Sequence, residues 1–141
     1  MSRLVINIPE VICFSHTLEV RIYDINHGQH LGHDRLISLL HEARSRFFQS
    51  LGYEELDIDG IGIVIADLQV VYLGEAFAGE QVKVDISLDS FASKSVAMYY
   101  HVSEVQSGRL IAKAKTGIVF FDYAERTAVL MPESFRVRFV H

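Results

Sequence analysis

Apolar residues follow a helical period over only one long stretch of this chain. They recur there at intervals of three or four positions: Leu36, Leu40, Ala43, Phe47 and Leu51. This spacing places them on one face of a helix. Asp34 suits the N-terminal end as a cap or first-turn carboxylate, and Gly52 is a natural stop. The pattern therefore predicts a helix over about 34–51.

Elsewhere the pattern alternates with a period of two and predicts strands. A half-buried strand from His16 to Tyr23 precedes the helix. After the helix, residues 61–73 form a nearly continuous apolar run, which indicates a strand covered on both faces. The clearest half-exposed strand then covers Val82 to Asp89. Two more strands and a short helical turn complete the prediction: 96–105, 110–122 and 132–135.

The predicted order is a strand, the helix and then four strands in a meander. The chain has 141 residues, which is the size of one domain, so residues 1–141 are expected to fold as a single unit. The predicted class is α+β, with one long central helix wrapped by an antiparallel sheet of about five strands. Long edge strands need covering, and pairing across a two-fold axis achieves this. We therefore expect a homodimer or homotetramer.

Composition excludes several functional classes. The net charge of −5 and the lack of a basic stripe argue against nucleic-acid binding. Cys13 is the single cysteine; it rules out an intrachain disulfide, fits a reducing compartment and is interpreted as an apolar filler. The first residues lack the features of a signal peptide, and no apolar run approaches the roughly 18 residues of a membrane span. A cytoplasmic protein that does not enter the membrane is expected.

The loop between the first strand and the helix is the expected site, because the helix must pack on the sheet and its first turn then lies against a large apolar surface. The residues of this region resemble a known family: Val20-Arg21-Ile22-Tyr23-Asp24-Ile25-Asn26, Gly28, His30 and, in the helix, His41-Glu42-Ala43-Arg44. They are similar to hotdog-fold acyl-CoA thioesterases of the 4-hydroxybenzoyl-CoA thioesterase-like family, over residues 16–122. The resemblance implies a hotdog fold and hydrolysis of an acyl thioester, carried by CoA or an acyl-carrier protein, without metal or organic cofactor.

The chain departs from this family at the catalytic carboxylate. The second Asp of the family's D-T-D segment falls on Asn26, whose amide can neither attack as a nucleophile nor act as a general base. It can still hold a substrate or a water. A second branch of the fold has Asn or Gln at this position and an acidic residue on the helix, and the gapless count lands on His41 with Glu42 beside it. His41 and Glu42 are therefore the candidate bases.

In both branches a backbone N–H at the helix start polarises the thioester carbonyl, and the count places this donor at His33. Free N–H groups and the helix dipole stabilise an oxyanion in any protein. Asp24 and His30 are assigned to substrate binding, although Asp24 also suits a role in fixing the loop. Lys94 and Lys113 are candidates to meet CoA phosphates.

Two alternatives remain open. A hydratase or dehydratase of acyl thioesters with the same fold reads D-x-N-P-x-H, which would make Asp24 and His30 an acid–base pair, although His30 comes one residue late and the Pro is absent. A protein that binds acyl thioesters without catalysis is the other alternative. A metal site from His27, His30 and His33 is not expected, because no Cys or carboxylate completes a recognised spacing.

Overall fold

The computed structural model describes residues 4–140 of the chain. The helices and strands follow in this order: β1 (Phe14–Glu19), the single 3-10 turn η1 (Ile22–Asp24), α1 (His33–Ser50), β2 (Gly62–Tyr72), β3 (Gln81–Asp89), β4 (Ser95–Glu104), β5 (Leu110–Asp122), β6 (Thr127–Ala128) and α2 (Glu133–Phe139). Each predicted element is present. The helix begins one residue earlier than predicted, and α2 extends further than the single turn expected at residues 132–135.

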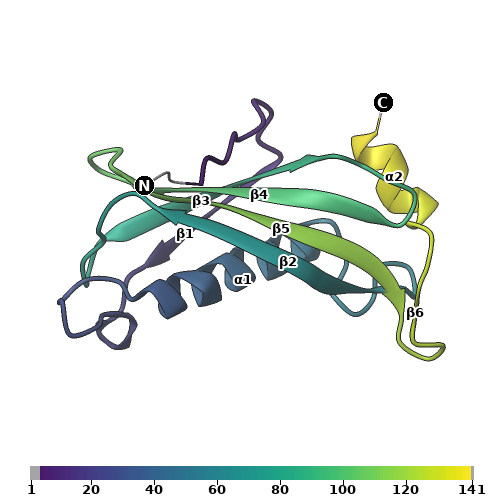
Figure 1. Cartoon of the computed structure of the whole chain (residues 1–141), viewed down its shortest axis with the longest axis horizontal. Coiled ribbons are helices and arrows are strands. Elements are labelled where there is room, and N and C mark those ends of the chain that lie inside the picture. The colour runs from purple at the N-terminus through teal and green to yellow at the C-terminus, as the bar shows by residue number, and fades with distance from the viewer. Residues whose placement is uncertain (1–3, 141) are drawn as a thin grey trace.

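The strands form one antiparallel sheet in the order β1-β3-β4-β5-β2, with the two-residue β6 paired to β5. β1 and β2, which flank α1 in the sequence, lie at opposite edges of the sheet. The sheet curves around α1, which lies along its concave face (Figure 1). One long helix wrapped by an antiparallel sheet is the hotdog fold, as predicted.

The core lies between α1 and the concave face of the sheet. The helix contributes Leu36, Leu40, Ala43 and Phe47, all at most 1% exposed. The buried sheet residues opposite come from every second position: Val82, Val84, Ile86, Met98, Tyr100, Val102, Ala112, Ala114, Ile118 and Phe120. At the far end, Phe135 of α2 is fully buried and packs on Phe120 and Phe48. No helix within residues 4–140 is long and apolar enough to cross a membrane.

The first strand ends at Glu19, four residues before the predicted end at Tyr23. The carboxylate of Asp24 accepts hydrogen bonds from the Arg21 backbone N–H at 2.9 Å and from the Arg21 guanidinium at 3.1 and 3.2 Å. These bonds bend the chain into the turn η1 and expose Ile22 and Tyr23. Alternation over residues 20–23 therefore did not indicate a strand.

The prediction that residues 61–73 are covered on both faces is wrong within one chain. β2 is an edge strand, and residues 65–69 in its middle are exposed. The strand bulges between Ile65 and Asp67, where Asp67 Oδ1 accepts the Gly117 N–H at 2.8 Å. An apolar run reports that a segment can be buried, but it does not say which partner covers it.

β3 was predicted to be half exposed, but two of its outward residues, Asp85 and Ser87, are buried. The hydroxyl of Ser15, on the neighbouring strand β1, donates a hydrogen bond to the Asp85 carboxylate. Residues 4–13, predicted only as a lead-in, run over the convex face of the sheet (Figure 1). Burial raises the pKa of Cys13 to about 11, and its thiol donates to the Ile86 carbonyl, as suits a filler. Residues 1–3 of the lead-in lie outside the described residues.

Candidate functional site

The loop that leads into α1 is tied to itself and to the neighbouring turn by backbone hydrogen bonds. The Asn26 N–H donates to the His30 carbonyl at 2.9 Å, and the Gly32 N–H donates to the Asp24 carbonyl at 2.9 Å. The Leu31 N–H donates to Ala76 in the turn between β2 and β3 at 2.7 Å. The loop therefore presents a fixed surface at the start of the helix.

Asn26 lies exposed at the tip of this arrangement. Its Oδ1 accepts the Gly28 N–H at 2.9 Å, which is a local turn bond of the kind that Asn commonly makes. An added Cβ on Gly32 would lie 3.7 Å from Asn26 Cβ and 2.8 Å from Asp34 Oδ1, so Asn26 and Asp34 flank the last residue before the helix. The Asn26 amide nitrogen remains able to donate to a carbonyl or a water.

Asp24 is 1% exposed, and both of its carboxylate oxygens accept hydrogen bonds from Arg21. Burial raises the pKa of Asp24, but the Arg21 guanidinium and backbone N–H outweigh it, so the pKa lies below its usual value. Asp24 thus acts as an ionised anchor of the loop. His30 is half-buried, with Nδ1 3.1 Å from the Leu31 carbonyl and Nε2 3.9 Å from Glu75.

The helix begins with Gly32 as N-cap and His33 as its first residue, and no side chain caps it. Among the described residues, no acceptor takes the His33 N–H, as is usual in the first turn of a helix. Tyr72, at the end of β2, donates through its hydroxyl to the His33 carbonyl at 3.0 Å and meets the His33 ring edge-on. Tyr72 thereby holds the first turn of α1, and the His33 N–H is the first amide of that turn.

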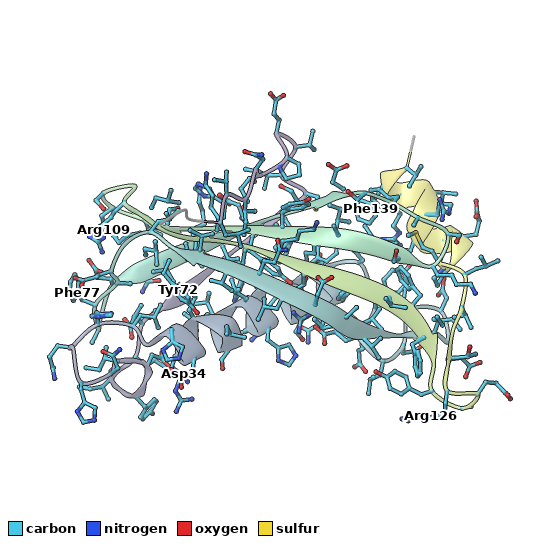
Figure 2. All side chains as sticks on the ribbon, viewed as in Figure 1. Asp34, Tyr72, Phe77, Arg109, Arg126 and Phe139 are labelled. Atoms are coloured by element: carbon cyan, nitrogen blue, oxygen red, sulfur yellow. The ribbon has the colours of Figure 1, made fainter. Side chains whose placement is uncertain are left out.

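Arg109 braces this end of the molecule, a role that the sequence did not reveal. It lies in the turn between β4 and β5 and donates to the Glu75 carbonyl at 2.9 Å and to the Glu80 carboxylate at 2.6 Å. Figure 2 shows Tyr72, Phe77 and Arg109 at the same end as Asp34. Arg109 thus fixes the turn that carries Ala76, the acceptor for the loop. Only long-range contacts define this role, so no local pattern signalled it.

The exposed side of α1 carries a shallow hollow of about 340 Å³. The hollow is lined by Ser38, His41, Glu42, Ser45, Arg46 and Gln49. His41 Nε2 lies 3.4 Å from Oε2 of Glu55, a residue of the connection to β2 that sequence reasoning missed. Glu42 contacts His16 of β1 at 3.2 Å. The two candidate bases therefore point toward different neighbours.

The structure does not bring His33 and His41 together within one chain. They are eight positions apart, which corresponds to about 12 Å along a helix axis. A carbonyl bound at the His33 N–H is therefore out of reach of His41 of the same chain. The expected oxyanion donor and the expected base of one chain therefore lie at different heights along the helix axis.

The remaining candidates lie elsewhere. Lys94 is at the opposite end of the sheet, where the neighbouring Ala92 and Ser93 carbonyls accept from Arg136 and Met131. Lys113 of β5 lies opposite His101 of β4 in the strand register, on the convex face of the sheet. Within residues 4–140, no three His, Cys, Asp or Glu side chains are grouped to hold a metal ion.

Comparisons with known proteins agree with this fold. A family model described as the thioesterase-like superfamily matches residues 20–139. Among solved structures, a 1,4-dihydroxy-2-naphthoyl-CoA thioesterase from Synechocystis is similar over 88% of this chain and 93% of its own, with a TM-score of 0.80 and 17% identity. A putative thioesterase from Pseudomonas aeruginosa is similar over 91% and 98%, with a TM-score of 0.83 and 19% identity.

A protein from Staphylococcus aureus, solved in complex with CoA, is also similar, over 94% of this chain and 85% of its own, with a TM-score of 0.81 and 18% identity. The search of curated proteins gave no match. At these identities the structural likeness establishes the fold, and the chemistry has to be argued from the residues of this chain.

Proposed function

Since the chain belongs to the thioesterase-like superfamily, we propose that it hydrolyses an acyl thioester of CoA or of an acyl-carrier protein. The observation that carries the proposal is the His33 N–H, which is the first amide of α1 and lacks an acceptor among the described residues. A donor held there is positioned to stabilise the oxyanion that forms when water attacks a thioester carbonyl.

Each residue of the loop has a part in this mechanism. Asn26 donates through its amide nitrogen to the substrate or to the attacking water, while its oxygen holds the turn. Asp24 and His30 shape the surface that receives the substrate, Asp24 by pairing with Arg21. The base that takes the proton from water comes from the helix, where His41 and Glu42 are the candidates. No metal or organic cofactor has a part in these steps.

The active form is a homodimer, or a homotetramer of two such dimers. β2 is a long edge strand whose unpaired backbone groups can pair with a second copy of the strand, and Ile65 and Leu68 lie exposed on it. About 12 Å separates the His33 amide from His41 along one helix. A thioester bound at the amide of one protomer therefore takes its base from the other protomer.

A hydratase of acyl thioesters is a weaker alternative. It would need Asp24 and His30 as a free acid–base pair, and the Asp24 carboxylate is buried with both oxygens bonded to Arg21. Loss of enoyl-CoA absorbance without release of thiol would favour this activity.

Thiol release from a panel of acyl-CoAs tests the proposal. The panel should include short, long and aromatic acyl groups, among them 1,4-dihydroxy-2-naphthoyl-CoA, the substrate named for the Synechocystis protein. We expect turnover of at least one member at neutral pH. Tight binding of one member without turnover of any would refute hydrolysis and favour a binding protein.

A further inference from the structure

A continuous row of polar groups runs from the exposed side of α1 into the core. It starts at His41, whose Nε2 lies 3.4 Å from Glu55 Oε2. The other oxygen of Glu55 accepts a hydrogen bond from Arg44 Nε at 2.9 Å. Arg44 also donates to the Tyr100 hydroxyl at 3.3 Å, and Tyr100 shares a hydrogen bond of 2.8 Å with Thr116. The row crosses from α1 to β4 and β5.

The buried end of this row fixes the position of Glu55. Arg44 is 8% exposed, and a guanidinium so buried is costly unless it is paired and hydrogen-bonded. Burial lowers the pKa of Arg44, but contacts with Tyr100 and Glu55 outweigh it, and the pKa lies above its ordinary value. The Glu55 carbonyl also accepts the Ile63 N–H at 3.0 Å. Both the backbone and the carboxylate of Glu55 are therefore held.

From this geometry we propose that Glu55 is the positioning residue for His41 and that His41 is the general base of the hydrolysis. In this arrangement the Nε2–H of His41 is directed at Glu55 Oε2, 3.4 Å away, which leaves the lone pair on Nδ1 free to take a proton from water. A fixed carboxylate behind an imidazole selects the tautomer and orients the ring. The inference rests on the proposed thioesterase function and chooses between its two candidate bases.

Glu42 lacks this support. Among the described residues, the hydrogen-bond partner of its carboxylate is the His16 imidazole at 3.2 Å. No buried cation holds it in one orientation. The other ionisable groups that line the hollow beside His41, or the hollow next to it, are exposed: Glu42, Arg46 and Glu54. Glu55 is thus the carboxylate that the core holds against His41.

The test is a cycle of variants, Glu55→Gln, His41→Ala and the double variant. Gln keeps an oxygen that accepts from Arg44 but loses the charge of the pair, so the stability of each variant is measured alongside kcat. The NH₂ group of Gln then faces His41 Nε2 and favours the tautomer without a free Nδ1 lone pair. We expect kcat to fall at least about tenfold with KM nearly unchanged, since general bases contribute about 10²–10⁴ in rate. In the His41→Ala background, Glu55→Gln should change kcat less than about twofold. Glu54→Gln, the same change one residue away, is the matched control.

Equal losses of kcat from Glu55→Gln in both backgrounds would overturn the proposal, because a purely structural role does not depend on His41. Nitrogen NMR of labelled histidine gives a readout that needs no turnover. We expect His41 protonated on Nε2 in the wild type and shifted toward Nδ1 in Glu55→Gln. A wild-type His41 protonated on Nδ1 would refute the positioning role. If no acyl-CoA is hydrolysed, the proposed function fails and the NMR result still decides how Glu55 acts on His41.

Discussion

Proline at position 33 would remove the backbone N–H of the candidate site together with the imidazole, while the start of the helix is kept. His33 is the first residue of α1, where proline is well tolerated because the N–H has no intrahelical acceptor. Gly32 has ψ of 149°, the extended conformation that a residue before proline prefers. The His33 carbonyl stays available to Tyr72. His33→Pro therefore removes the proposed oxyanion donor without breaking the helix.

The expected loss of activity follows from the role of the donor. Removing one donor from an oxyanion hole typically costs about 10²–10³ in kcat, which corresponds to about 2.7–4 kcal/mol. No hydrogen bond of the folded chain is lost, because the described residues offer the His33 N–H no acceptor. The free energy of unfolding should change by less than about 1 kcal/mol, as for proline at a compatible position.

The assay is thiol release from the best acyl-CoA of the panel, and His33→Ala is the matched control. Alanine removes the same imidazole and its edge contact with Tyr72 but keeps the N–H. We expect kcat of His33→Ala to lie within a few fold of the wild type and that of His33→Pro to fall by two to three orders of magnitude. Equal kcat values in a folded Pro variant and the Ala variant would refute the oxyanion role.

Two further predictions concern assembly and pH. Leu68→Lys places a charge on the exposed edge strand, and light scattering should report a monomer, whereas Leu130→Lys, at a more exposed apolar residue away from β2, should leave the oligomer intact. An unchanged oligomer in the Leu68→Lys variant would exclude β2 pairing. Hydrogen bonds from the Ser107 side chain and from the Gln106 and Ser107 backbone lower the pKa of Glu104 from 4.5 to about 2. Since the folded pKa is depressed, the ionised carboxylate stabilises the fold above about pH 4.5 and this contribution is lost as the pH falls toward 2. Urea midpoints of wild type and Glu104→Gln should differ at pH 7 and converge near pH 2, and a constant difference would contradict this.

The spacing of apolar residues was sufficient to predict an element whose structure depends mainly on its own sequence. The spacing of Leu36, Leu40, Ala43 and Phe47 predicted both α1 and its buried face, because a helix repeats every 3.6 residues whatever lies around it. The alternation of β3 predicted the strand correctly but misjudged its outer face. The Asp85 carboxylate meets Ser15 of β1 and His101 of β4, which come from distant parts of the sequence and reach it only in the folded sheet.

By itself the sequence determined the helix, the strands and the loop at the helix start, because periodicity and turn residues act over a few neighbours. The hotdog fold was predicted from the resemblance to a known family. Only the tertiary structure decided which groups surround that loop. Tyr72 reaches His33 across 39 positions of the chain, and Arg44 reaches Tyr100 across 56. Such contacts depend on the order of strands in the sheet, which places β2 at an edge and leaves it open.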